Sequence, residues 1–599
     1  MIDLNHLFPE EKLQQHNCML AFQEALVNLN KGNVQETCVN IMNTPLVASA
    51  DHVQQIAANI FRIAYMRPGL IPYLVDICKF LIENQSQQNA LSNFKDLIVP
   101  TDIPNQRWYR SFLINCINKQ VISIEDFMSL LTSFPPCESI YLLFCWFAPV
   151  IKSRDEIVYE QILESFRQAQ HLSAEFTYFR DHFNEMQKNN WELQRFFFRT
   201  GYFRVSYAYY LKNDDLLHFR QLITQNELVL DKKVSSKVID KEDHIQNKYL
   251  ASIDESDTKN DANRLDFDFD QRVESSLFER CDFIRHRPTL LQFAAFFGAS
   301  KCFRYLIDSG ANPKIDDDEG KRLIQFVIAG GNTEIFAMCE NNENIELDGA
   351  IQTAVEFQRF DMMLDLLNKM EIDINHSTEA FPSIFHYAAK HNNMRVLLFC
   401  LEQGCPVNLR DLHDKTPLHY AAQFCQYDTL LALVDLYDID INAVDDRGRT
   451  PLHYAAKYNK IDSVYILSIH PELDLNICDK TGDNPLILAA KHGCNQIIYH
   501  ILSNNLDVNH KNMLGLSALH YAVKKGHYHT VSLLLTHYAI DINIRDEILI
   551  FCFIKEFLIS LYWTPLHFAA YSGDVEMIKI ILAFPGINIS CKTVSFTFL

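Results

Sequence analysis

Apolar residues in the first part of the chain recur at helical spacing. Along Met19–Leu29, Val53–Ala64, Leu70–Ile82 and Ile157–Phe166 they return every three or four residues, which places them on one face of a helix. No hairpin-like punctuation separates these stretches. We therefore expect residues 1–230 to form stacked amphipathic helices, arranged either as an irregular α-solenoid or as a bundle.

A different pattern governs the second half of the chain, where one heptapeptide recurs at a fixed period. Residues 416–422 read TPLHYAA, and the same seven letters return at 450–456, 34 residues later. Variants follow at 484 (NPLILAA), 517 (SALHYAV) and 564 (TPLHFAA), and weaker copies stand at 289, 322, 349 and 383. Such self-similarity indicates a repeat architecture, in which each unit buries its apolar face against its neighbours.

Each good copy carries the residues that begin a helix. Thr416, Thr450 and Thr564 offer a hydroxyl as N-cap, and the Pro that follows suits the first helical position, where a backbone N–H is not needed. Gly448 and Gly482, just before two of the copies, supply the positive φ that a tight turn requires. Each copy therefore predicts a turn followed by a helix.

The heptapeptide at a period near 33 residues resembles the ankyrin repeat. This resemblance implies a mainly α fold: an ankyrin-repeat solenoid of helix-turn-helix plus β-hairpin units, preceded by an α-helical N-terminal region. The weaker units around 289–371 resemble the uncharacterised degenerate ankyrin-type domain of large protist ankyrin families, a resemblance that implies no activity. We divide the chain into an α-helical N-terminal region (1–230), an acidic flexible linker (231–263), degenerate ankyrin-type repeats (264–382) and ankyrin repeats (383–599).

The linker is predicted from its composition. Residues 231–263 are rich in Asp, Lys, Ser and Asn and poor in large apolar side chains. Burial of so little apolar surface cannot offset the conformational entropy that ordering would cost. We expect regular structure to resume as a helix near Gln271.

One repeat is longer than the others. Ser517 and Thr564 are 47 residues apart, 13 more than the 34 of neighbouring units, and the excess lies within 548–562, mostly Ile, Leu and Phe. One interpretation is a hydrophobic finger that inserts into a partner or a membrane surface. The other is non-coding sequence read through in the gene model. The chain also ends in 593–599 (TVSFTFL) without the polar C-terminal cap that a solenoid normally needs, which favours the second interpretation.

Composition narrows the classes of function. The 54 Lys and Arg stand against 75 Asp and Glu, a net charge of −21, which disfavours electrostatic binding of nucleic acid or anionic lipid. The 16 cysteines include no CxxC pair, which indicates a reducing, cytoplasmic location rather than disulfides or a zinc site. No apolar stretch reaches the roughly 20 residues of a membrane span.

The sequence lacks the common motifs that carry catalytic chemistry. Neither HExxH, GxxxxGK[ST], GxGxxG nor GxSxG occurs, so we predict no enzyme activity, no catalytic residues, no cofactor and no metal. His386, His419, His453, His520 and His567 occupy one slot of successive repeats. Side chains repeated at this period stack in a row and do not converge on one site. The family resemblance implies that each imidazole ties a helix cap to the adjacent hairpin.

The sequence therefore favours a non-catalytic protein–protein interaction module, an ankyrin array with a concave surface for a protein partner. Hairpin tips and first helices would form that surface, rigid before any partner arrives. A locally basic row of tip residues on an acidic chain favours an acidic partner. The candidate partner-binding residues are Arg410, His413, Lys415, Asp446, Arg447, Arg449, Lys480, Asp483, Lys511 and Met513.

Two other functions stay open. The first is an adaptor, in which residues 1–230 dock a larger complex such as a ubiquitin ligase while the repeats select its target. The second is an enzyme with its site among the N-terminal helices. A partner found on residues 1–230 alone would favour the adaptor, and a cluster of polar residues in a deep pocket there would favour the enzyme.

Overall fold

The computed structural model divides the chain into two compact units. The middle unit is Ala21–Met363, and the terminal unit combines Met1–Leu20 with Leu364–Leu599. The described residues are 4–591 without 86–89, 99–106, 133–137, most of 170–205, 225–267, 274–280, 341–344, 346, 348, 376–381, 505, 547–548, 553–556 and 561. The predicted linker at 231–263 and the final segment 593–599 lie outside them.

In the first part of the middle unit, the described residues form helices joined by short turns, as the apolar spacing predicts. Ser49 accepts a hydrogen bond from the His52 N–H at 3.3 Å and begins α3 (Ala50–Met66), whose Ile56 and Ile60 are fully buried. The further helices, short 3-10 turns aside, are α1 (Glu10–Val27, shared with the terminal unit), α2 (Val34–Met42), α4 (Ile71–Glu83), α5 (Phe94–Ile98), α6 (Arg107–Asn118), α7 (Ile124–Thr132), α8 (Glu138–Arg154) and α9 (Glu156–Gln168).

The second part of the middle unit is a stack of helix pairs. The pairs are α15 (Leu290–Phe297) with α16 (Ser300–Asp308), α17 (Leu323–Gly330) with α18 (Thr333–Glu340), and α19 (Ala350–Glu356) followed by α20 (Phe360–Met370), which runs into the terminal unit. Thr289 and Gln292 form a reciprocal capping box at the start of α15. Gln271 itself lies outside a helix, and Arg272 pairs as an isolated antiparallel bridge with Thr289, whereas residues 274–280, where the expected helix could continue, lie outside the described residues.

One more helix pair stands at the start of this stack. α12 (Tyr207–Lys212) packs on α15 and α13 (Leu216–Thr224) packs on α16. Asp214, in the turn between them, accepts the Cys302 N–H at 3.0 Å at the start of α16. Asn392 does the same for the Thr429 N–H at 3.0 Å in the regular repeats. α12 and α13 are therefore stacked like a repeat, although they lack the heptapeptide.

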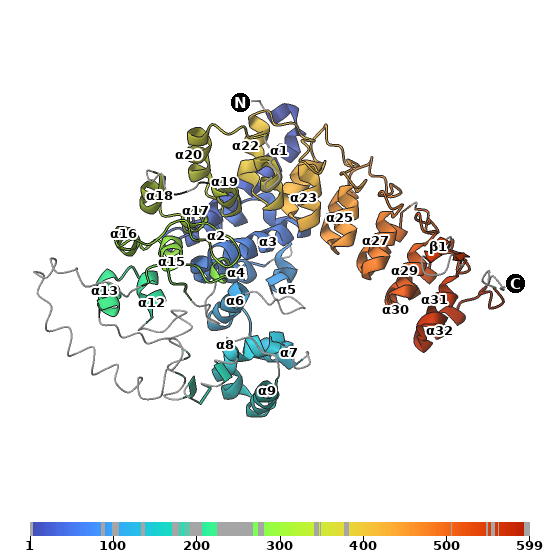
Figure 1. Cartoon of the computed structure of the whole chain (residues 1–599), viewed down its shortest axis with the longest axis horizontal. Coiled ribbons are helices and arrows are strands. Elements are labelled where there is room, and N and C mark those ends of the chain that lie inside the picture. The colour runs from blue at the N-terminus through green and yellow to red at the C-terminus, as the bar shows by residue number, and fades with distance from the viewer. Residues whose placement is uncertain are drawn as a thin grey trace, which may run out of the picture. The chain divides into compact units, whose positions relative to one another are not determined.

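The terminal unit is a row of helix pairs joined by turns (Figure 1). We call the turn that directly precedes an inner helix a finger; residues 445–449 form one of them. Each heptapeptide forms an inner helix that packs on the next inner helix, and each is followed by an outer helix. The inner helices are α21 (Ile384–Lys390), α23 (Pro417–Phe424), α25 (Pro451–Lys457), α27 (Pro485–His492), α29 (Ala518–Lys524) and α31 (Pro565–Ser572). The outer helices are α22 (Met394–Glu402), α24 (Tyr427–Val434), α26 (Ile461–Leu467), α28 (Asn495–Leu502), α30 (Tyr528–Leu535) and α32 (Val575–Leu582).

Small and apolar side chains fill the space between neighbouring pairs. Ala455 and Ala456 on α25 are fully buried, as are Val464 and Leu467 on α26. The paired alanines let neighbouring inner helices approach closely, and burial of the apolar faces stabilises the stack. Both expectations for the fold, an N-terminal helical region and a solenoid of helix pairs, are confirmed.

Asparagines link the loops of successive units. The Asn442 side chain donates to the Glu472 carbonyl at 2.7 Å and accepts from the Asp474 N–H at 3.0 Å. Asn509 makes the same two bonds two units later, to the Ala539 carbonyl at 2.7 Å and the Asp541 N–H at 2.8 Å. These bonds satisfy backbone groups that would otherwise face solvent, and they fix the spacing between units.

The long repeat keeps a normal finger base. The Asp546 N–H donates to the Trp563 carbonyl at 2.9 Å, as the Asp445 N–H donates to the Arg449 carbonyl at 3.0 Å in a regular finger. The residues joined are 17 apart in the first case and four in the second, a difference of 13. The extra residues carry an antiparallel hairpin of β1 (Leu549–Cys552) and β2 (Phe557–Ser560), with Leu549 opposite Ser560. The insertion therefore lies entirely within the turn.

The N-terminal residues belong to the terminal unit. The Leu7 carbonyl accepts the Tyr437 N–H at 3.1 Å. His16 Nε2 lies 3.0 Å from Asp435 Oδ2, and Lys12 Nζ lies 3.3 Å from Asp435 Oδ1. Two parts of the chain more than 400 residues apart thus share one packed unit.

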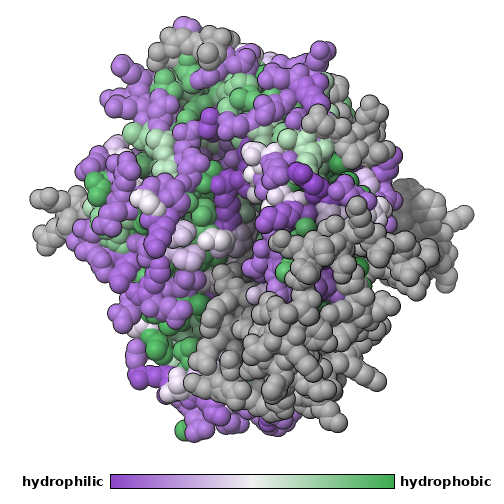
Figure 2. All heavy atoms as spheres, turned by 90° about the vertical axis from the view of Figure 1, so that its left-hand side faces the viewer, coloured by the Kyte–Doolittle hydropathy of each residue, from purple (hydrophilic) through white to green (hydrophobic). Residues whose placement is uncertain are grey.

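On the face in Figure 2 hydrophilic side chains predominate, and hydrophobic ones gather in small separate patches. None of the described helices is both long enough and apolar enough to span a bilayer.

Candidate protein-binding face

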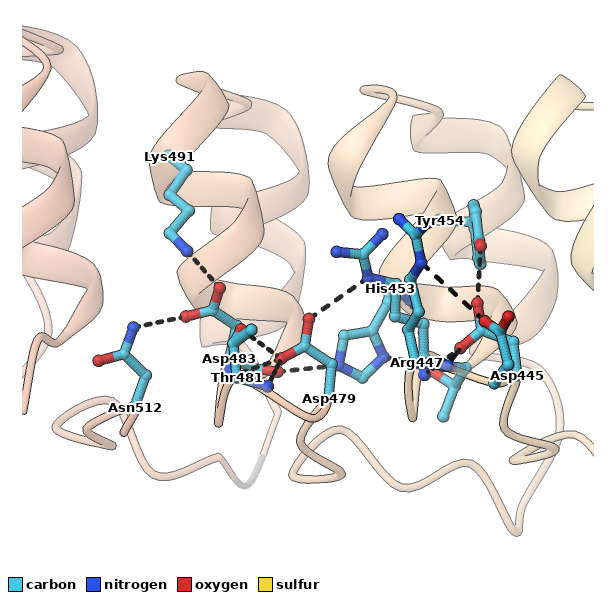
Figure 3. Close-up of polar contacts among 12 residues, drawn as sticks. Asp445, Arg447, His453, Tyr454, Asp479, Thr481, Asp483, Lys491 and Asn512 are labelled. Atoms are coloured by element: carbon cyan, nitrogen blue, oxygen red, sulfur yellow. Dashed lines mark hydrogen bonds and ion pairs between the residues drawn. The ribbon is translucent and has the colours of Figure 1, made fainter. Parts of the chain in front are cut away.

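Asp411, Asp445 and Asp479 each hold the base of a regular finger, and Asn512 takes this position in the next one. Asp445 Oδ1 accepts the N–H groups of Arg447 at 2.9 Å and Arg449 at 2.7 Å, and its Oδ2 accepts the Tyr454 hydroxyl at 2.7 Å (Figure 3). Burial raises the pKa of Asp445, but these hydrogen bonds more than offset it and hold the pKa below its usual value. Asp411 repeats the arrangement with Tyr420 at 2.7 Å.

Sequence reasoning missed these aspartates, although a signal was present. Asp411, Asp445 and Asp479 each stand five residues before a helix cap, at the period of the heptapeptide. The neighbouring Asp446 was selected instead, because it lies in the same turn. The alternation of buried and exposed side chains within a turn decides which acid faces solvent, and the repeat motif does not show it.

Histidines tie each helix cap to the next finger. His419 Nδ1 accepts the Thr416 N–H at 3.0 Å, and its Nε2 donates to the Arg449 carbonyl at 2.9 Å. His520 does the same with Ser517 at 3.1 Å and Trp563 at 3.0 Å. Burial lowers the pKa of His419 and of His520 to about 4, so both rings are neutral near pH 7. The imidazoles therefore act as linkers between successive units.

Five predicted site residues are exposed at the finger tips. His413 Nδ1 lies 3.1 Å from Asp446 Oδ2 of the next finger, with 68% and 40% of their side chains exposed. The Arg447 side chain is 71% exposed and lies beside Asp446. Lys480 and Met513 are exposed on the following two fingers, and Met513 is 75% exposed. These side chains can reach a partner without rearrangement of the finger.

The other five are held by the protein itself. Arg410 Nη1 donates to the Val444 carbonyl at 2.7 Å, and Arg449 Nε lies 3.3 Å from the buried Asp479. Lys415 lies 4.7 Å from the Tyr454 ring centroid, and Lys511 is half-buried. Asp483 is buried, where it pairs with Lys491 and accepts the Asn512 amide at 2.8 Å (Figure 3). These groups shape the fingers.

The inner helices continue this face away from the fingers. On α25, Tyr454, Lys457 and Tyr458 stand four, seven and eight residues after the cap, so they share one side of the helix. Lys491, at the Lys457 position of α27, reaches its finger through Asp483. Fingers and inner helices therefore form one continuous surface, which we call the finger–helix face. Sequence reasoning did not select its helical part.

A cluster of metal-ligating side chains would be a separate kind of site. Among the described residues, no three His, Cys, Asp or Glu side chains gather as ligands of a metal ion. The geometry instead defines a class: a helical repeat protein whose stacked units share one extended, internally braced surface.

Comparison with known families names the repeat. Family models for ankyrin repeats match residues 351–445, 385–477 and 452–546, and a further ankyrin-repeat model matches 561–591. Residues 351–546 and 561–591 are therefore ankyrin repeats. The matches begin in the unit of Gly349, and in the long repeat they stop before the hairpin and resume just after β2. Ankyrin repeats generally mediate protein–protein interactions, so protein partners are implied.

Individual relatives resemble a limited part of the chain. Human neurogenic locus notch homolog protein 1 is 32% identical over 158 residues, which is 24% of this chain and 6% of that protein. The mouse homolog is 30% identical over 155 residues, 24% of this chain and 6% of its own length. A fowlpox virus putative ankyrin repeat protein, FPV233, is 35% identical over 60 residues, 10% of this chain and 12% of its own. The chain thus spans a small fraction of these relatives.

Proposed function

We propose that the chain is a non-catalytic binding protein whose finger–helix face holds a protein partner. The internal bracing of this face supports the proposal. Asp445 fixes the turn of its finger, and His419 fixes the distance from the preceding cap to that finger. A surface that is already ordered loses little conformational entropy on binding, so more of the contact energy remains as affinity.

The exposed tips define the chemistry of the contact. Arg447 and Lys480 place cationic groups on neighbouring fingers, and Met513 adds an exposed apolar side chain on the next one. Because the whole chain carries a net charge of −21, a local cationic row selects partners by charge complementarity. The partner that fits is an acidic protein with an apolar residue at one end of its contact.

Charge reversal at the tips tests the proposal. Full-length wild type and an Arg447→Glu/Lys480→Glu variant are used to capture partners, and the affinity for a partner obtained with the wild type is then measured. We expect at least about tenfold weaker binding, because two attractive contacts become repulsive. Arg449 is left unchanged, since its reversal would break the contact with Asp479.

A matched control separates local from global charge. Lys31→Glu/Lys79→Glu changes the net charge equally, at exposed or half-exposed lysines of the middle unit. This variant should bind like the wild type. Equal affinity of the tip variant and the wild type would contradict the finger tips as the contact.

The adaptor role and the cytoplasmic location stay predictions. The cysteines among the described residues are free thiols, which supports a reducing compartment. For the adaptor, cross-linking of the full chain to captured proteins distinguishes the outcomes. A second, different protein cross-linked to residues 34–168 would support it, and cross-links from 383–591 alone would count against it.

A further inference from the structure

Lysines recur at one position of consecutive inner helices. Lys457, Lys491 and Lys524 each stand seven residues after the cap of α25, α27 and α29, and Lys525 follows directly. These four residues are the lysine row. Each position lies three residues beyond the side chain that packs toward the finger, Tyr454 in α25, so the row lies on the finger–helix face.

The helices that carry this row contain basic side chains without acidic ones. The six inner helices of the terminal unit contain no Asp or Glu at all, on a chain that holds 75 of them. Asp483 pairs with Lys491 and balances that one charge. Among the described residues, no carboxylate forms an ion pair with Lys457, Lys524 or Lys525. The row therefore keeps a net positive charge.

The cations of the row lie close enough to act together. His492, next to Lys491 at the end of α27, has its pKa lowered by burial and further by Lys457, Lys491, His527 and Lys525. Lys457 belongs to the preceding inner helix, α25, and Lys525 directly follows the next inner helix, α29. Positive charges from three consecutive units therefore lower the pKa of this one ring.

The spacing of the row sets the spacing of its ligand. Packed helices lie roughly 8–10 Å apart. An extended chain in the polyproline II conformation advances about 3.1 Å per residue with three residues per turn, so side chains three residues apart share one face and cover one unit. We infer that the lysine row binds an extended acidic protein segment in which a carboxylate recurs at every third residue. This inference rests on the proposed function and names the partner chemistry of the same face.

A protein segment fits better than a nucleic acid. A nucleic-acid strand presents one phosphate about every 3.4 Å, so a row spaced by one repeat would leave most phosphates unpaired. The net charge of −21 repels a polyanion as a whole. Exposed Tyr458 beside Lys457 adds an aromatic contact of the kind that protein interfaces use.

Synthetic peptides test the spacing. The probes are two fluorescein-labelled 15-residue peptides of equal composition: one repeats Glu-Ala-Ser, and the other places its glutamates together. Binding to the full-length protein is followed by fluorescence anisotropy at two salt concentrations. We expect the spaced peptide to bind about fivefold to tenfold more tightly, because only its carboxylates match the row without strain.

Variants of the row test the contact. Lys457→Glu/Lys524→Glu/Lys525→Glu should weaken the spaced peptide more than tenfold, and the single change Lys525→Glu should give a smaller loss in the same direction. Lys31→Glu/Lys79→Glu should have no effect. A peptide that repeats Lys-Ala-Ser should bind the triple variant more tightly than it binds the wild type. Thermal unfolding checks that each variant is folded.

The outcomes separate this inference from the proposed function. Equal affinity for the two acidic peptides, unchanged binding by the variants, or equally strong competition by a 15-nucleotide oligo(dT) would overturn the inference. If one of these occurs while Arg447→Glu/Lys480→Glu still releases a captured partner, the proposed function stands without the lysine row. If neither set of changes affects partner binding, the proposed function fails as well.

Discussion

In three of the finger aspartates, the direction in which the pKa of the carboxyl shifts follows the presence or absence of one tyrosine hydroxyl. In the finger of Asp445, the Oδ2 atom accepts the hydroxyl of Tyr454, nine residues later. The side chains at the corresponding positions after Asp317 and Asp546 are Phe326 and, beyond the insertion, Phe568. Oδ2 of both aspartates has no hydrogen-bond partner among the described residues. Burial raises the pKa of both carboxyls, whereas that of Asp445 is lowered.

Restoring the missing hydroxyl should stabilise the protein. A carboxyl with a raised pKa contributes stability at low pH and loses it as the pH rises from the ordinary value of 3.8 through the raised one. At pH 7 the Asp546 carboxylate is therefore ionised at a cost. We expect Phe568→Tyr to raise the free energy of unfolding at pH 7 by about 1–2 kcal/mol, through a hydrogen bond to the charged Oδ2. Urea denaturation followed by circular dichroism measures it.

The reverse change is the matched control. Tyr454→Phe should lower the stability by a similar amount, because it leaves Asp445 Oδ2 unpaired. The two variants should therefore shift the urea midpoint in opposite directions. A loss of stability in both would show that the phenylalanine site has no room for the hydroxyl.

The buried histidines predict acid sensitivity. The pKa of His419 and of His520 falls from 6.5 to about 4 on burial, so the folded protein binds fewer protons than the unfolded chain between these values. Their contribution to stability is complete above pH 6.5 and is lost as the pH falls toward 4. The slope is about 1.4 kcal/mol per pH unit for each histidine. Unfolding free energies measured from pH 7.5 to 4 should show this loss.

Substitution of one linker should flatten that pH dependence. We expect His419→Gln to be less stable than the wild type at pH 7, because the bond to the Arg449 carbonyl is disturbed, yet to lose less between pH 6.5 and 4. His413→Gln, at an exposed tip, should keep the wild-type slope. An unchanged slope in His419→Gln would contradict the assignment of the acid sensitivity to this ring.

At the scale of elements, the closed finger base separates the insertion from the repeat that carries it. Deletion of residues 548–560 would leave Asp546 and Trp563 four positions apart, as Asp445 and Arg449 are. Tyr562 would then take the place of Gly448, and both already have positive φ, 43° and 75°. We expect the deletion variant to fold with an unfolding midpoint close to that of the wild type. Circular dichroism and thermal unfolding test this.

The opposite result would give the hairpin a structural role. Aggregation or a large loss of stability on deletion would show that the repeat depends on β1 and β2. A neutral deletion would leave both interpretations of residues 548–562, and sequencing the transcript across codons 540–570 then decides between them. An intact message there would defeat the read-through interpretation.

The elements were predictable where the heptapeptide is strong and less so elsewhere. Thr450 and Pro451 begin a helix through local bonds, so the sequence predicts α25 directly. α12 also has a local N-cap, Ser206, but it lacks the heptapeptide, and its place in the stack depends on Asp214 and Cys302, which are far apart in sequence. Contacts of that kind are set by tertiary packing and leave no local signal.

The candidate site was predictable as a region and less well as a set of residues. Arg447 and Arg449 stand two positions apart in one turn, and the sequence gives them equal weight. The turn directs Arg447 to solvent and Arg449 to Asp479, with side-chain exposures of 71% and 18%. Such a difference depends on the next finger, which a single repeat does not contain. The lysine row was missed for a related reason, since its members belong to three different units.

At the scale of the whole molecule, the charge of one surface differs in sign from the net charge of the chain. The chain carries a net charge of −21, yet its six terminal inner helices hold no acids, and four of them hold a lysine. The acids of the terminal unit instead lie in loops and outer helices, as Asp438, Asp462 and Asp474 do. Solubility and selection of a partner can thus be served by different surfaces of one molecule.

The terminal unit is also joined by residues from opposite ends of the chain, and this contact can be tested. Asp435 receives both His16 and Lys12, and the side chains of His16 and Asp435 are only 4% and 9% exposed. Asp435→Ala would leave the buried His16 ring without its partner, so we expect a loss of about 1–3 kcal/mol and faster hydrogen exchange in residues 10–20. Asp438→Ala removes an exposed acid three positions away and should change neither. Equal exchange in the two variants would mean that the N-terminal residues do not contribute to the stability of the repeats, and the unit would then begin at Leu364.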